Sequence, residues 1–229
     1  MSDTARAGRQ VGDGPLARGA ATVHILLVVE LMLLLTTAPG LVGLVLLDRD
    51  RSNLPLAALC LTPLGPAVAA ALHTLRHQRP DLTDLRPAAV FRRAWRANLG
   101  PVSRIWLPLL LWLTVVAVNL AHRAAVGLPG WWSALLVVVA VTALLAGVNA
   151  LVITTCFTFR TRDVARLAAY FLIRRPGVTI GHAALLALAA GVVAVGSEAV
   201  LALLGAVFVA LLHRTSRPMI DTIEKEFTA

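Results

Sequence analysis

Long apolar stretches alternate with short arginine-rich connections along most of the chain. A helix needs about 20 apolar residues to cross the hydrocarbon core of a bilayer, and this length predicts spans at about 21–47, 54–75, 105–121 and 131–159. Ala38-Pro39-Gly40 interrupts the first span, which favours a kinked or re-entrant helix, and Pro63, Gly65 and Pro66 lie near the middle of the second. The pattern is typical of an all-α membrane protein.

The last apolar stretch, from Val178 to Leu212, is too long for one crossing. It has 35 residues, and at 1.5 Å per residue a single helix would overshoot the bilayer by roughly 20 Å. Gly196-Ser197-Glu198 interrupts it and is typical of a tight turn. We therefore expect two spans here, at about 178–196 and 198–213, and about six spans in total.

The positions of lysine and arginine give an independent estimate of the topology. Cytoplasmic loops are enriched in these residues, and six spans with an inner N-terminus place 18 of them inside and 3 outside, namely Arg49, Arg51 and Arg123. With a single final span, 15 lysine and arginine residues would lie inside and 6 outside, so two final spans give the stronger asymmetry. We therefore expect a multi-pass plasma-membrane protein with a disordered cytoplasmic tail at 1–20, a transmembrane domain at 21–213, a cytoplasmic tail at 214–229 and both termini in the cytoplasm.

Composition supports a membrane protein and argues against a water-soluble domain, a nucleic-acid-binding protein and a metal site. The chain is 58% hydrophobic with a mean hydropathy of +0.79, more than a water-soluble domain carries. Its net charge of +9 is spread over loops that face one side, which indicates anionic lipid headgroups as a partner and does not favour nucleic acid. Cys60 and Cys156 lie within apolar runs without metal-ligand spacing, so no disulfide, metal or cofactor is expected.

Two connections are amphipathic, and both are expected to be interfacial helices on the cytoplasmic side, at about 88–99 and 164–174. In the first, aromatic and basic side chains fall on opposite helical faces. Each helix is followed by a predicted break, at Gly100-Pro101 and at Pro176-Gly177. Two interpretations stay open, a membrane-surface anchor and a docking surface for a cytoplasmic partner. The candidate contact residues are Phe91, Arg92, Arg93, Trp95 and Arg96.

Polar side chains inside a predicted span are costly and are therefore candidate sites. Glu30 is the carboxylate that lies deepest in a span, and it is interpreted either as a substrate or proton site or as a structural carboxyl between helices. Asn119 and Asn149 also lie within spans, where interhelical hydrogen bonds are the expected role. The six histidines lie near span ends or in loops and are expected at the interface. The sequence contains no nucleotide, hydrolase or metal motif, so no catalytic residue is assigned.

Two segments carry a resemblance to a known family. Leu64-Gly65-Pro66-Ala67-Val68-Ala69-Ala70-Ala71-Leu72, a basic connection and then Phe91-Arg92-Arg93-Ala94-Trp95-Arg96-Ala97-Asn98 resemble the YesL-like bacterial membrane proteins, a family of unknown function. The resemblance covers mainly Leu54 to Trp106. The chain departs from the family pattern in an extra segment, Leu47 to Leu56, and in Glu30, where asparagine is usual.

The resemblance implies a link to carbohydrate uptake, because such proteins tend to be encoded beside sugar transporter components, and it implies no catalytic residues. We therefore expect a non-enzymatic accessory or regulatory partner of a carbohydrate transport system, with sugar transporter subunits as partners. The alternative is a small-solute or sugar permease, which is favoured by Glu30 and by the broken first two spans.

Overall fold

The computed structural model describes residues 15–48, 50–77, 86–123 and 129–227, and within these ranges all regular structure is helical, without strands. The predicted fold class is confirmed. The elements are α2 (Pro15–Leu46), η1 (Arg51–Asn53), α3 (Leu54–Cys60), α4 (Leu64–His77), α5 (Pro87–Ala121), α7 (Gly130–Cys156), α8 (Thr161–Arg174), α9 (Pro176–Val195), α10 (Glu198–Leu203) and α11 (Gly205–Phe227).

Five helical segments of the described residues are long and apolar enough to cross a membrane: α2, η1 to α4 taken together, α5, α7 and α9. The predicted count of six is not confirmed. The expected sixth span, 198–213, consists of the six residues of α10 and the apolar start of α11. Its 16 residues would extend about 24 Å at 1.5 Å per residue, which is less than the roughly 30 Å of a bilayer core.

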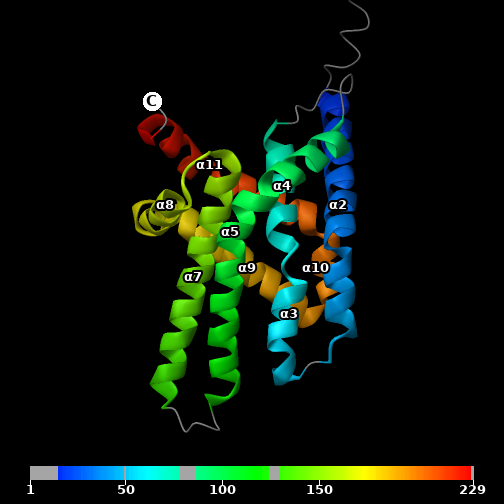
Figure 1. Ribbon diagram of the computed structural model, residues 1–229. Helices are drawn as coiled ribbons and strands as arrows, with labels where there is room; N and C mark the ends of the chain where they lie inside the picture. The colour runs from blue at the N-terminus through cyan, green and yellow to red at the C-terminus, as the bar shows by residue number, and fades with distance from the viewer. Residues whose placement is uncertain (1–14, 49, 78–85, 124–128, 228–229) are drawn as a thin grey trace, which may run out of the picture.

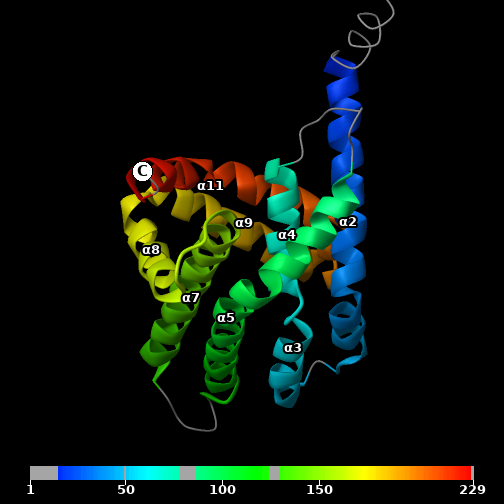
Figure 2. The same cartoon turned by 45° about the horizontal axis from the view of Figure 1, so that its top comes forward.

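The structure also corrects the predicted break at Gly100-Pro101. The expected interfacial helix at 88–99 and the span at 105–121 form one helix, α5, which contains Pro101 and Pro108. A proline removes one backbone donor and bends a helix without necessarily ending it. Figure 2 shows the resulting bend between the first and second halves of α5. The break at Pro63, in contrast, is present, because α3 ends at Cys60 and α4 begins at Leu64.

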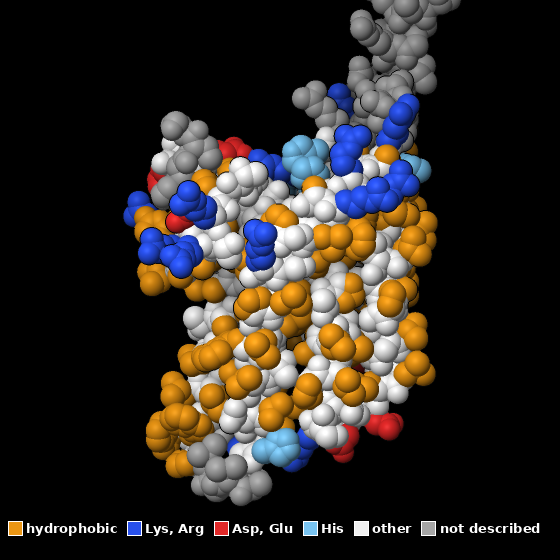
Figure 3. Space-filling view, in the orientation of Figure 1, with side chains coloured by type: hydrophobic (Ala, Val, Ile, Leu, Met, Phe, Trp, Pro, Cys, Tyr) orange, Lys and Arg blue, Asp and Glu red, His pale blue; other side chains and the backbone are white. Residues whose placement is uncertain are grey.

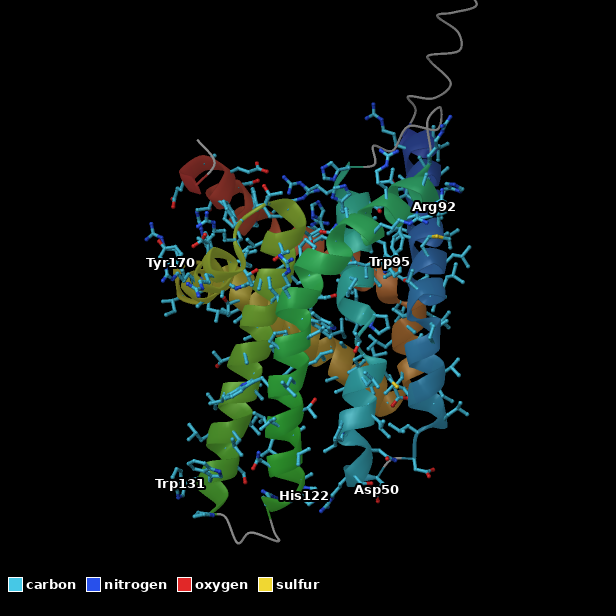
Figure 4. The ribbon with its side chains drawn as sticks, viewed as in Figure 1. Asp50, Arg92, Trp95, His122, Trp131 and Tyr170 are labelled. Atoms are coloured by element: carbon cyan, nitrogen blue, oxygen red, sulfur yellow. The ribbon has the colours of Figure 1, made fainter. Side chains whose placement is uncertain are left out.

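The two ends of the bundle differ in charge (Figures 1 and 3). Lysine and arginine gather at one end, which carries the start of α2, the end of α4, the start of α5, α8 and the end of α11. We call this the basic end. The opposite end carries the connection from α2 to α3, the end of α5 and the start of α7, with Asp50, His122 and Trp131 (Figure 4).

Exposed apolar side chains cover much of the surface between these two ends (Figure 3). Leu111 of α5 is 68% exposed, Val138 of α7 is 61% exposed and Leu188 of α9 is 53% exposed. A continuous apolar surface of this kind is unfavourable in water and favourable in hydrocarbon. The distribution is therefore compatible with a membrane protein whose ends lie in the two polar interfaces.

The main hydrophobic core lies toward the basic end, where α2, α4, α5, α7, α8, α9 and α11 all contribute buried residues. Small side chains on α4 allow its neighbours to approach closely. The buried small residues of this helix are Gly65, Pro66, Ala67, Ala69, Ala70 and Ala71. Helix α4 consequently contacts α2, α5, α7 and α11 and stands at the centre of the bundle.

Candidate functional site

Glu30 lies near the middle of α2, and its carboxylate reaches the start of α11. The Oε2 atom accepts a hydrogen bond from the backbone N–H of Ala206. The Oε1 atom is buried without a hydrogen-bond partner among the described residues. A Cβ built on Gly205 would lie 3.5 Å from Oε1, so the carboxylate sits against the first turn of α11.

The location of this contact explains why a carboxylate is held there. The chain leaves helical geometry at Leu204 between α10 and α11, and the first N–H groups of a new helix have no partner within that helix. These groups also carry a partial positive charge from the helix dipole. Glu30 therefore caps α11 from a neighbouring helix. This contact favours the interpretation of Glu30 as a structural carboxyl between helices, although its Oε1 atom has no partner among the described residues.

A second polar cluster, which we call the buried triad, consists of Asn149 on α7, His182 on α9 and Ser216 on α11. The Nδ1 atom of His182 lies 3.0 Å from Oδ1 of Asn149, and its Nε2 atom lies 2.9 Å from Oγ of Ser216. The amide nitrogen of Asn149 also donates to the carbonyl of Ala168 on α8, at 3.2 Å. All three side chains are buried, with exposures of 0% or 1%.

The hydrogen-bond pattern restricts the protonation of the triad. Because the amide nitrogen of Asn149 donates to Ala168, its Oδ1 must accept from His182, so Nδ1 carries a hydrogen. In a neutral imidazole Nε2 is then an acceptor, and the Ser216 hydroxyl donates to it. The same hydroxyl also lies 2.7 Å from the Leu212 carbonyl, which offers it a second acceptor. Every polar group of the triad is therefore satisfied, and four helices are joined.

A serine next to a histidine that an amide orients has the connectivity of an activated nucleophile. Catalysis, however, requires a substrate atom to reach the serine oxygen. Ser216 is completely buried and His182 is 1% exposed, so the described surroundings leave no approach. The arrangement is an internal hydrogen-bond network, in which His182 is buried between helices.

The two predicted asparagines differ. Asn149 has the interhelical role expected of it, through its bonds to α8 and α9. Asn119 is exposed, and its amide donates to the Val115 carbonyl one turn earlier in the same helix. The structure therefore does not bring Glu30, Asn119 and Asn149 together into one site.

The predicted contact residues of the first amphipathic segment also separate into two groups. Phe91 is 1% exposed and belongs to the protein core, so its predicted contact with lipid or a partner is wrong. Trp95 is partly buried against the same core. Arg92, Arg93 and Arg96 are exposed, and Figure 4 shows Arg92 at the basic end beside α2. The basic face persists, whereas the aromatic face packs inside.

Polar contacts at the basic end connect the C-terminal half of α11 to the rest of the bundle. Arg76 at the end of α4 forms an ion pair with Glu224, and its guanidinium carbon lies 5.8 Å from the ring centroid of Phe157. Arg175, just before α9, donates to the hydroxyl of Thr222 at 2.8 Å. Sequence analysis did not pair these residues because they are far apart along the chain.

The fold and these clusters define an all-helical protein with several helices apolar enough to span a membrane. Within the described ranges, no group of three or more His, Cys, Asp or Glu side chains could hold a metal ion. A family model described as "Protein of unknown function, DUF624" matches residues 25–120. This segment includes Glu30, all of α4 and nearly all of α5, and the description assigns no function. No curated protein and no solved structure matches the chain.

Proposed function

We propose that the chain lies in the plasma membrane with its basic end in the cytoplasm, and that it is a non-enzymatic accessory partner of a transport system. The observation that carries this proposal is the exposed face of Arg92, Arg93 and Arg96 on a helix whose other face is fixed in the core. The concentration of basic side chains at one end supports the orientation.

The geometry of α5 makes this face suitable for recognition. Phe91 and Ala94 are buried at 1% and 3% exposure, so the first turns of α5 pack against the core and leave the basic face outward. Arginine side chains on a fixed helix present planar donors that match carboxylates and phosphates bidentately. The face therefore fits an acidic surface of a cytoplasmic or membrane-embedded partner, with anionic lipid as the competing ligand.

The nature of the transport system rests on the resemblance to the YesL-like family. That resemblance favours carbohydrate uptake and sugar transporter subunits as partners. The matching family model covers both segments on which the resemblance is based, Leu64–Leu72 and Phe91–Asn98, and adds no activity of its own.

Copurification from native membranes tests the proposal. The tagged full chain is expected to retain transporter subunits, and the triple variant Arg92→Gln, Arg93→Gln, Arg96→Gln is expected to lose them. A matched triple variant on exposed positions of the α7–α8 region, Arg160→Gln, Arg162→Gln, Arg166→Gln, removes the same charge from the same end and should retain them. Absence of any transporter subunit from the wild-type preparation would contradict the proposal.

A permease is the second candidate, and the unpaired Oε1 of Glu30 at a helix break supports it. Helix ends near the middle of a membrane can contact a bound solute, and a buried carboxylate oxygen could accept a hydrogen bond from it. Solute uptake into proteoliposomes, measured for wild type and Glu30→Gln, tests this candidate. Uptake that is unchanged in Glu30→Gln would exclude the carboxylate from transport.

A further inference from the structure

A cavity of about 870 Å³ lies at the opposite end of the bundle, between the end of α5, the start of α7 and η1. Its polar lining includes Arg51, Arg123 and Ser133, and its apolar lining includes Val137 and Val138. Arg51 and Arg123 are two of the three arginines that sequence analysis assigned to the outer side. The cavity thus combines a cationic mouth with an apolar wall.

Ser133 is the most informative residue of this lining. It is 8% exposed, and its Oγ atom is buried without a hydrogen-bond partner among the described residues. Other hydroxyls in these helices, such as those of Thr114, Thr142 and Thr155, donate to the carbonyl four residues earlier. A buried hydroxyl without such a bond is costly, so a hydrogen bond to a molecule bound in the cavity would stabilise this side chain.

The start of α7 adds positive potential to the same place. Pro129 stands at its N-cap and provides no side-chain hydrogen bond, and Gly130 in the first turn lines the cavity. The N-terminus of a helix carries a partial positive charge and exposes N–H donors. Gly130, Ser133 and Val137 lie on one face of α7, so this potential and the hydroxyl face the space where the arginines stand.

Arg51 is held in place at the cavity by the end of α5. Its Nη1 atom donates to the carbonyl of Ala121 at 3.0 Å, one of the carbonyls that a helix end leaves without an intrahelical partner. A guanidinium has five N–H donors, so this contact fixes the orientation of the side chain and leaves donors for a ligand. Arg123 is exposed two residues farther along.

We propose that this cavity binds the anionic headgroup of an amphiphile, with Arg51 and Arg123 contacting the anion, Ser133 donating a hydrogen bond and the Val137–Val138 wall contacting the apolar chain. The proposed headgroup is a phosphate ester, because a guanidinium group can bind two phosphate oxygens at once. Val137 and Val138 are 48% and 61% exposed, so an acyl chain can leave the cavity along the apolar surface of α7. The site lies at the other end of the bundle from Arg92, Arg93 and Arg96, and it does not depend on the proposed docking role.

Titration of the purified full chain in neutral detergent tests the site, with the thermal unfolding midpoint as the readout. The probes are dioleoyl phosphatidylglycerol, dioleoyl phosphatidylcholine and soluble sn-glycerol 3-phosphate. Phosphatidylglycerol is expected to raise the midpoint saturably and phosphatidylcholine is not. If glycerol 3-phosphate raises the midpoint and phosphatidylglycerol does not, the cavity binds a phosphate group, but its ligand is a soluble molecule and not a lipid. No saturable effect of either anion would overturn the proposal.

Variants identify the residues responsible. Arg123→Gln is the primary variant, because Arg51 also caps α5, and it should raise the half-saturating concentration of phosphatidylglycerol about fivefold. Ser133→Ala should raise it about threefold, as one lost hydrogen bond does. Arg162→Gln removes an exposed arginine of α8 at the basic end, outside the Arg92, Arg93 and Arg96 face, and should leave the titration unchanged. Equal weakening by Arg162→Gln and Arg123→Gln would mean that lipid binds through net charge, and it would overturn the assignment.

Discussion

The indole ring of Trp106 on α5 lies directly against Gly65 on α4. A Cβ at position 65 would stand 2.5 Å from the ring, and the Nε1 atom of Trp106 donates to the Leu61 carbonyl at 3.0 Å. Leu61 lies in the turn that separates α3 from α4, so the tryptophan both fills the space above the glycine and satisfies a carbonyl that the broken helix leaves open. This pair fixes the distance between the two most extensively packed helices of the bundle.

Gly65→Ala is therefore expected to destabilise the protein by about 1–3 kcal/mol, the usual cost of overpacking a filled site. Gly191→Ala on α9 is the matched control, because a Cβ there would meet no described atom within 4 Å. Thermal unfolding of the two variants in the same detergent measures the difference. Equal midpoints for the two variants would show that Trp106 moves away without cost.

The buried triad predicts a large loss on truncation of its central residue. His182→Ala removes the partner of the Asn149 carbonyl oxygen and of the Ser216 hydroxyl and leaves a cavity, which together should cost about 2–4 kcal/mol. Equilibrium unfolding measures this cost. Asn119→Ala, which removes only a bond within one exposed turn, should stay within about 0.5 kcal/mol of wild type.

Coupling within the triad provides a separate prediction. Once His182 is absent, Ser216 has only the Leu212 carbonyl to bond, so Ser216→Ala should cost less in the His182→Ala background than in wild type. A double-mutant cycle should give an interaction of about 0.5–3 kcal/mol, the range for residues in one network. Strictly additive changes would mean that His182 and Ser216 contribute independently.

Asp50, in the connection before η1, predicts a pH dependence at the opposite end. Its Oδ1 atom accepts hydrogen bonds from the backbone N–H and the hydroxyl of Ser52, both at 2.7 Å, and these bonds lower the pKa of the carboxyl below its ordinary value of 3.8. A carboxyl with a depressed folded-state pKa stabilises the fold above its unfolded-state pKa, and this contribution is lost as the pH falls through the folded-state value. The difference in thermal unfolding midpoint between wild type and Asp50→Asn should be constant near neutral pH. It should decrease at acidic pH, where the Asp50 carboxyl becomes protonated. A difference that grows in acid would contradict this assignment.

The proposed orientation predicts which end of the molecule reagents reach in intact cells. In a background without Cys60 and Cys156, Arg123→Cys should react with a membrane-impermeant maleimide added outside, whereas Arg92→Cys should react only after the cells are lysed. Both positions are exposed, so intrinsic accessibility does not bias the comparison. Labelling of Arg92→Cys in intact cells would reverse the orientation.

Much of the helical framework was predictable because it depends on local composition. Apolar length located the helices that could cross a membrane, and Pro63 correctly marked the break before α4. Pro101 did not mark a break in α5, because whether a proline bends or ends a helix depends on the packing on both sides of it. Buried Phe91 and Ala94 on one side and Val102 and Leu110 on the other hold the two halves in one continuous helix.

The candidate sites were less predictable because they are formed by residues far apart in the chain. Glu30 and Asn149 were identified by their cost within an apolar stretch, but nothing in the sequence connects Asn149 with His182 or Ser216. His182 lies near the start of an apolar segment, and its position there resembles an interfacial one until α11 is seen to pack over it. Ser133 carried no signal at all, since its unpaired hydroxyl becomes evident only in the folded chain.

The contact between Glu30 and Ala206 also has a consequence for synthesis of the protein. The two residues are 176 positions apart, and at about 5–20 residues per second roughly 9–35 s pass between their additions to the growing chain. The Glu30 carboxylate is therefore made long before the backbone amide that donates a hydrogen bond to it. A chain that stops before Gly205 lacks this donor, so the contact between α2 and α11 can form only after synthesis has passed Ala206.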